Sequence, residues 1–110
     1  MSLLPFLKPP QIVVLYLQNP RERYWGALRG IDGTGVMLQG SELGGFEDWM
    51  RQVQAGSGDV LPSQQFFPLH RVEKILIDAP SGDAPSLAQQ FERRFGRPIW
   101  SVLGDEGPRP

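Results

Sequence analysis

Hydrophobic and polar positions in the first 40 residues predict three short strands separated by tight turns. The run IVVLYL, residues 12–17, is β-branched and aromatic, so it predicts a strand that is covered on both faces or meets a neighbouring subunit. In the following YWGALRGID, the period of two places Trp25 and Ala27 on one face and Leu28 on the other. The DGTG turn then leads into VMLQG, because aspartate and glycine tolerate the positive φ of tight turns. Residues 11–40 therefore predict an antiparallel meander.

Residues 41–62 interrupt this pattern with a helical one. The segment FEDWMRQV follows two glycines and precedes AGSGD. Its apolar residues fall at the spacing of one helix face, at Phe46, Trp49, Met50 and Val53. This predicts an amphipathic helix inserted in a long loop, with its apolar stripe covering the β-structure rather than forming a ligand site. A mobile hairpin extension is the alternative interpretation.

The segment FFPLHRVEKILID, residues 66–78, places a proline and the single histidine of the chain within an apolar run. Together with the two preceding residues, it predicts one strand at 64–69, a sharp bend around His70 and Arg71, and a last strand at 72–78. Proline has no N–H to donate to a sheet, so Pro68 is expected on an edge strand or at a bulge.

A second helix is predicted over residues 86–95. Ser86 with Gln89 three positions later is a capping-box pattern, and a glycine and a proline end the helix. The apolar residues of its one face are Leu87, Phe91 and Phe95. Residues 99–103 predict a short extended segment before a polar tail.

Five short, bent strands within about 70 residues are typical of a small antiparallel barrel, closed or nearly closed. The predicted fold class is therefore mainly β, in a single domain over residues 1–110. The barrel is expected at about 11–78, the inserted loop at about 41–62 and the C-terminal helix at about 86–95.

Composition excludes several classes of function. Hydrophobic residues make up 40% of the chain and charged residues 21%, which is ordinary for a soluble globular protein. With no cysteine, one histidine and no closely spaced carboxylates, no metal site, no cofactor and no enzyme is predicted. The lack of a signal-peptide pattern and of a long apolar run predicts a cytoplasmic protein with no membrane segment. The formal net charge of −1 gives no general attraction for nucleic acid, so RNA binding would need a local basic patch.

The order of these features resembles the Sm and Sm-like family, the ring-forming five-stranded barrels that include the bacterial RNA chaperone Hfq. In VVLYLQNPRERYWGALRGID, Gly26, Leu28 and Asp32 have the spacing of the family's first motif. In the second motif, PLHRVEKI lines up without gaps against the YKHAISTI type of segment, which brings His70 onto the family's histidine. The resemblance covers roughly residues 11–78.

The resemblance implies an Sm-like (SH3-like) barrel that closes into a homo-oligomeric ring of five to seven subunits. The fourth strand of one subunit would pair with the fifth strand of the next. The interface residues that it implies are Phe66, Phe67, Pro68, Leu69, Ile75 and Ile77. Pro68 would be harmless there if its missing N–H faces no partner, and would remove one hydrogen bond per subunit if it does.

The resemblance also implies a site for single-stranded RNA at His70, Arg71 and Asp32, with Arg29 able to approach the same face. The sequence departs from the family here, because DGTGV brings neither the aromatic residue nor the asparagine of the first motif, and Leu69 replaces a lysine. The alternative function is a structural or protein-interaction ring without RNA. In that case His70 and Asp32 are turn residues and Arg29 is a solvated strand residue.

Overall fold

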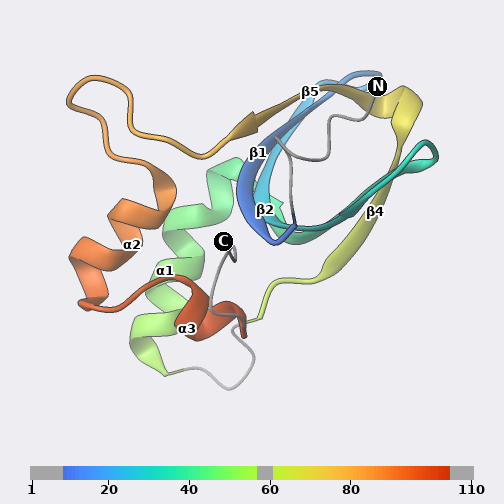
Figure 1. Ribbon diagram of the computed structural model, residues 1–110. Coiled ribbons are helices and arrows are strands. Elements are labelled where there is room, and N and C mark those ends of the chain that lie inside the picture. The colour runs from blue at the N-terminus through green and yellow to red at the C-terminus, as the bar shows by residue number, and fades with distance from the viewer. Residues whose placement is uncertain (1–8, 57–60, 105–110) are drawn as a thin grey trace.

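Five strands, three α-helices and two 3₁₀ turns make up the computed structural model, which describes residues 9–56 and 61–104 (Figure 1). The elements in chain order are β1 (Gln11–Leu17), β2 (Glu22–Ile31), β3 (Gly35–Glu42), η1 (Leu43–Gly45), α1 (Phe46–Ala55), β4 (Gln64–Pro68), η2 (Leu69–Arg71), β5 (Val72–Ile77), α2 (Leu87–Phe95) and α3 (Trp100–Leu103). The two predicted strands around His70 are confirmed, and the bend between them is the turn η2.

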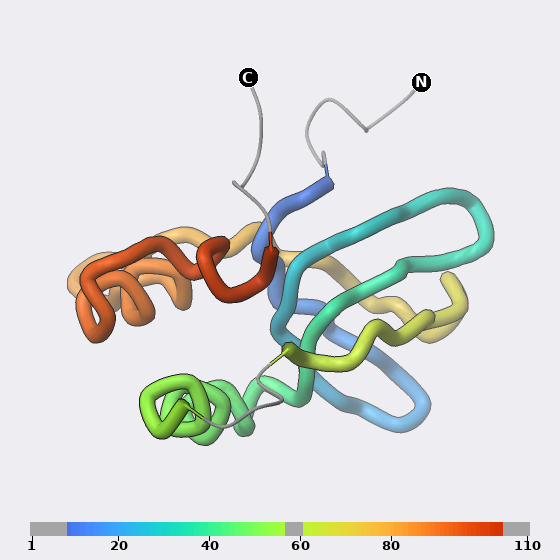
Figure 2. The backbone as a smooth tube through the Cα atoms, turned by 90° about the horizontal axis from the view of Figure 1, so that it is seen from below, coloured from blue at the N-terminus to red at the C-terminus, as the bar shows by residue number. Residues whose placement is uncertain are grey.

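All five strands belong to one antiparallel sheet, in the order β4-β3-β2-β1-β5. The predicted meander β1-β2-β3 forms its centre, β4 pairs with β3, and β5 returns to pair with β1. The sheet is strongly curved in Figures 1 and 2. Among the described residues it is not closed, because the two edge strands pair with β3 and β1 alone. The prediction of a mainly β fold with five antiparallel strands is confirmed, in the form of an open curved sheet.

Each face of the sheet carries its own apolar cluster. On the inner face, which we define as the face of Leu28, the buried residues are Val13, Leu15, Leu17, Leu28, Val36, Leu38 and Phe67. On the opposite, outer face, Ile12, Trp25 and Ala27 pack against the helices. Figures 1 and 2 show all three helices on this one side of the sheet. The alternation along β2 therefore separates two cores, as its sequence pattern predicts.

The predicted inserted helix is confirmed as α1, and the hairpin alternative is wrong. Phe46, Trp49 and Met50 are buried, and the Trp25 ring lies 4.8 Å from the rings of both Phe46 and Trp49. The stripe thus covers the outer face of the sheet, as expected. Gly56 ends the helix at a φ of 71°, a conformation that favours glycine. Residues 57–60 of the predicted insertion lie outside the described ranges.

The predicted second helix is confirmed as α2, including its capping box. The Ser86 hydroxyl accepts a hydrogen bond from the Gln89 N–H, and the Gln89 side chain accepts one from the Ser86 N–H. Asp78, just after β5, adds a second cap, because its carboxylate accepts the N–H groups of Leu87 (2.8 Å) and Ala88 (3.0 Å). These bonds satisfy orphan donors of the first turn and tie α2 to the end of β5.

The extended segment predicted at residues 99–103 is wrong. The chain instead forms the short helix α3, in which the Leu103 N–H donates to the Ile99 carbonyl at 3.2 Å. Ile99 and Leu103 lie one turn apart, so the helix buries both in the outer-face cluster. Burial of this pair outweighs the strand preference of isoleucine and valine.

Within the described ranges, no helix is both long and apolar enough to cross a membrane.

Candidate functional site

Two turns that are far apart in sequence meet at one end of the sheet. The Leu69 N–H in η2 donates to the Thr34 carbonyl in the β2–β3 turn at 3.0 Å. This bond continues the β3–β4 ladder by one residue and brings Asp32 and His70 to the same end of the sheet. The His70 carbonyl accepts a bond from the Gln18 amide at 3.0 Å, while its side chain is exposed. The structure therefore brings Asp32 and His70 to one end of the sheet through backbone contacts, with Arg71 beside His70 in η2.

Asp32 organises the β2–β3 turn. Its Oδ1 accepts hydrogen bonds from the Thr34 N–H (2.8 Å) and the Thr34 hydroxyl (2.6 Å). These bonds, the hydroxyl one first, lower the pKa of Asp32 below its ordinary value. The carboxylate therefore stabilises the turn above its ordinary pKa, and this contribution is lost as the pH falls through the lowered pKa. At neutral pH Asp32 brings a negative charge to the end of the sheet where RNA phosphates would have to bind.

Arg71 links the turn η2 to the β1–β2 turn. Its Nε donates to the Gln18 carbonyl (2.8 Å), and its Nη2 donates to the Pro20 carbonyl (3.0 Å) and pairs with Glu22 (2.8 Å). The guanidinium thereby holds η2 against the β1–β2 turn. Its side chain is only 23% exposed, and its guanidinium already donates hydrogen bonds to acceptors in the same subunit.

Arg29 lies apart from the other three predicted RNA-binding residues. Its guanidinium donates to the side chain of Gln39 (2.6 Å) and to the carbonyl of Leu103 (2.9 Å), and it lies 6.0 Å from the centre of the Trp100 ring. These contacts belong to the outer face and to α3. Arg29 thus holds the C-terminal helix on the sheet, and the structure does not bring it to the two turns.

The two edge strands carry exposed apolar side chains. The exposed fraction is 51% for Phe66 on β4, 45% for Leu69 in η2, and 44% and 47% for Leu76 and Ile77 on β5. Phe67, also predicted at the interface, is buried inside its own subunit. Sequence reasoning missed Leu76, although three consecutive apolar residues on an edge strand were a signal for it.

The unpaired backbone groups of β4 follow from its register. Leu69 and Ser63 both bond toward β3, through the bonds Leu69 N–H to Thr34 and Gly40 N–H to Ser63. Antiparallel ladders alternate, so Gln64, Phe66 and Pro68 turn their backbone groups away from β3. The missing N–H of Pro68 therefore belongs to the outward row, and the β3–β4 ladder is complete without it.

The same reasoning applies to β5. The Asp78 N–H donates to the Ile12 carbonyl at 3.0 Å, and Leu76 lies opposite Val14 in the same register. Alternation then points the backbone groups of Ile75 and Ile77 away from β1. A register shift between Tyr16 and Leu17 leaves Glu73 as an extra residue, a bulge near the start of the strand.

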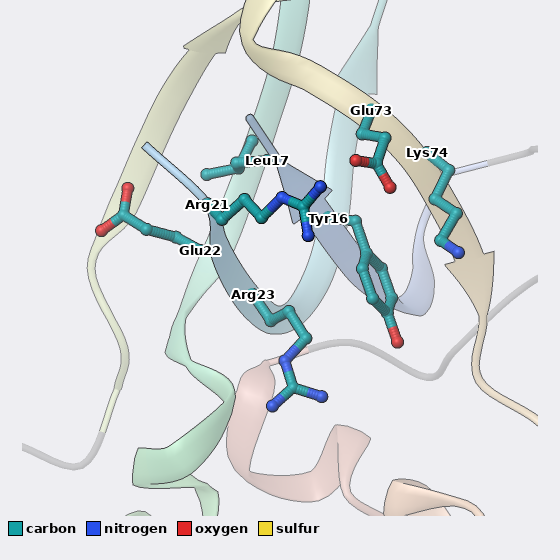
Figure 3. A pocket seen from close by; sticks show the side chains of 7 residues that line it. All are labelled: Tyr16, Leu17, Arg21, Glu22, Arg23, Glu73 and Lys74. Atoms are coloured by element: carbon teal, nitrogen blue, oxygen red, sulfur yellow. The ribbon is translucent and has the colours of Figure 1, made fainter. Parts of the chain in front are cut away.

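A hollow of about 450 Å³ lies between the β1–β2 turn and β5 (Figure 3). The residues that line it are Tyr16, Leu17, Arg21, Glu22, Arg23, Glu73 and Lys74. The segment NPRER contributes three of them, and the sequence predicts it only as a polar turn. The signal was two arginines beside a tyrosine-bearing strand, but which strand would face them depends on the return of β5 to β1.

The chain matches no known protein family, and neither a curated protein nor a solved structure is significantly similar to it. In the part of the chain that the structure describes, no group of three or more histidine, aspartate and glutamate side chains is placed to hold a metal ion.

Proposed function

We propose that copies of this chain join β4 to β5 into a ring of the Sm-like kind, and that the ring is a scaffold for protein interactions. The observation that supports this is that both edges of the sheet are unpaired among the described residues and carry exposed apolar side chains. Such edges promote aggregation unless they are covered. Because the two edges differ, joining one to the other is a head-to-tail contact, and such a contact closes into a ring when the rotation allows it.

The outward backbone groups limit the register of this β4–β5 joint, because an antiparallel pair brings outward residues opposite each other. Among the registers that this allows, we propose the one in which Phe66 of one copy faces Ile75 of the next. Gln64 then faces Ile77, and Pro68 faces the bulged Glu73. In this register Pro68 falls where β5 is irregular, so its missing N–H removes no regular ladder bond. The proline marks the end of the joint.

The side chains fit the same register. Side chains of directly opposed residues project on one side of a sheet, so Phe66 packs beside Ile75 and within reach of Ile77 on the diagonal. Phe66 and Ile77 are about half exposed in the isolated subunit. Their burial in the joint supplies the apolar contact that the short ladder needs.

Phe66→Glu is the test of this assembly. A charge at the centre of the joint is expected to weaken each contact by about 2 kcal/mol or more, roughly thirtyfold in its dissociation constant. Light scattering at micromolar concentration should show a closed oligomer for the wild type and monomers for the variant. Because Phe66 is 51% exposed, far-UV circular dichroism of the variant should be unchanged.

Arg93→Glu is the matched control, because it places the same side chain at an exposed position of α2, which belongs to neither edge strand. It should leave the oligomer mass unchanged. A wild-type monomer at these concentrations would refute the assembly, and so would a Phe66→Glu oligomer of wild-type mass.

Single-stranded RNA binding is the second candidate function, favoured by the bond that joins the Asp32 turn to η2. In a ring, one exposed His70 per subunit would be repeated around the axis. The engaged guanidinium of Arg71 and the negative charge of Asp32 oppose tight binding. Any affinity that arises here should be weak and should fall as salt is raised.

His70→Ala tests this candidate by fluorescence anisotropy of labelled oligo-U and oligo-A at low and moderate salt. RNA binding at this end of the sheet should weaken several-fold per site on loss of the imidazole, while Arg93→Gln, an exposed cation on α2, should have no effect. An Arg71 variant would be less informative, because that side chain holds the turn itself. Absence of binding at low salt would leave the scaffold function alone.

A further inference from the structure

The hollow between the β1–β2 turn and β5 concentrates positive charge in a chain whose formal net charge is −1. Arg21 lines it from the β1–β2 turn, Arg23 from the start of β2, and Lys74 from β5 (Figure 3). The Lys74 ammonium lies 4.6 Å from the centre of the Tyr16 ring, so the ring and the cation form one wall together. The positive charge is therefore local and belongs to a shaped surface.

Two of these cations have no polar partner in the part of the chain that the structure describes. Within residues 9–56 and 61–104, neither Arg21 nor Arg23 makes a hydrogen bond or an ion pair. The carboxylate of Glu22 is already paired with Arg71 at 2.8 Å, which removes it as a partner for them. Of the two lining carboxylates, Glu73 has no ion pair within the described ranges. Three cations and one unpaired carboxylate thus line the hollow.

We propose that this hollow binds a small molecule through a diphosphate group. Guanidinium groups match phosphate oxygens with paired hydrogen bonds, and an ammonium adds a point charge. A diphosphate has enough oxygens and enough charge to engage Arg21, Arg23 and Lys74 together, whereas one carboxylate would leave most of them unmatched. The hollow, about 450 Å³, has the size of small-molecule sites, and the Tyr16 ring gives it an apolar wall.

Isothermal titration with pyrophosphate, ADP and adenosine tests the site at low ionic strength. Pyrophosphate and ADP should each bind once per chain, and adenosine should not bind. Equal affinities would identify an inorganic or general diphosphate as the ligand, and a higher affinity for ADP would identify a nucleoside diphosphate. No binding of either phosphate compound, or binding of adenosine alone, would overturn the proposal.

Charge variants locate the site. The double variant Arg21→Gln, Arg23→Gln should weaken pyrophosphate binding at least about tenfold, from the loss of charge-assisted hydrogen bonds. Glu73→Gln should tighten it by about two- to fivefold, because it removes the opposing carboxylate. Arg93→Gln on α2 should leave the affinity within about twofold. Unchanged binding in the double variant would refute the site.

The site is separated from ring assembly by a measurement on monomers. The proposed register places Glu73, which lines the hollow, opposite Pro68 of the next copy, whereas Phe66 does not line it. The monomeric Phe66→Glu variant should therefore still bind pyrophosphate once per chain. Failure of the diphosphate site would then leave the assembly untouched, and failure of the assembly would leave the site measurable on monomers.

Discussion

Replacing Gly40 by alanine is expected to prevent stable folding. Gly40 on β3 faces Gly26 on β2, and the two strands approach there so closely that a Cβ on Gly40 would lie 1.8 Å from the Trp25 carbonyl oxygen and 2.7 Å from the Gly26 Cα. Both neighbours are backbone atoms in the middle of the sheet, so neither can move without separating β2 from β3. The expected destabilisation is several kcal/mol, a large part of the 5–15 kcal/mol that typically stabilises a domain.

Urea unfolding followed by circular dichroism measures this loss, and soluble yield reports it where the variant does not fold. Gly44→Ala is the control, because a Cβ at Gly44 meets no atom within 4 Å and its backbone is not in the left-handed region. We expect that control to stay within about 1 kcal/mol of the wild type. Wild-type stability of Gly40→Ala would show that the two strands do not approach as closely as described.

Phe91→Ala is expected to destabilise the chain by about 3–5 kcal/mol, the usual loss for a fully buried phenylalanine. Phe91 on α2 has no exposed surface, and its ring lies 5.6 Å from that of Trp49 and 4.5 Å from that of Phe95. It packs α2 against α1 over the outer face, where the exposed Arg94–Glu47 ion pair also joins the two helices. Its truncation leaves a cavity that neither helix can fill without leaving the sheet.

The same unfolding experiment measures this effect, and Phe91→Leu is its matched control. Leucine keeps much of the volume, so it should lose less than half as much stability as alanine does. A loss below about 1 kcal/mol in Phe91→Ala would mean that α2 contributes little to the fold.

Local signals predicted most of the elements. The alternation around Trp25 and Leu28 gave the two faces of β2, the spacing of Phe46 and Trp49 gave α1, and Ser86 gave the start of α2. In each case neighbouring residues settle the structure through side-chain periodicity or capping. Residues 99–103 failed for the opposite reason, since their helix depends on burial against a distant surface.

The candidate sites depended on contacts that no local pattern contains. The sequence makes both Arg71 and Arg29 candidate ligands for an anion, but one is held by the β1–β2 turn and the other by α3. The hollow lined by Arg21 and Lys74 exists only because β5 returns to β1, more than 50 residues along the chain. Long-range strand pairing, rather than residue type, decides which charges remain available.

The positions of the three tryptophans give the molecule a one-sided optical signal. Trp25 and Trp49 lie in the outer-face cluster, and Trp100 packs against it. The inner-face cluster is lined by aliphatic residues and Phe67, with Tyr24 beside it. Tryptophan fluorescence should therefore report changes in the packing of the helices on the outer face. It should respond little to changes in the packing of the inner-face cluster.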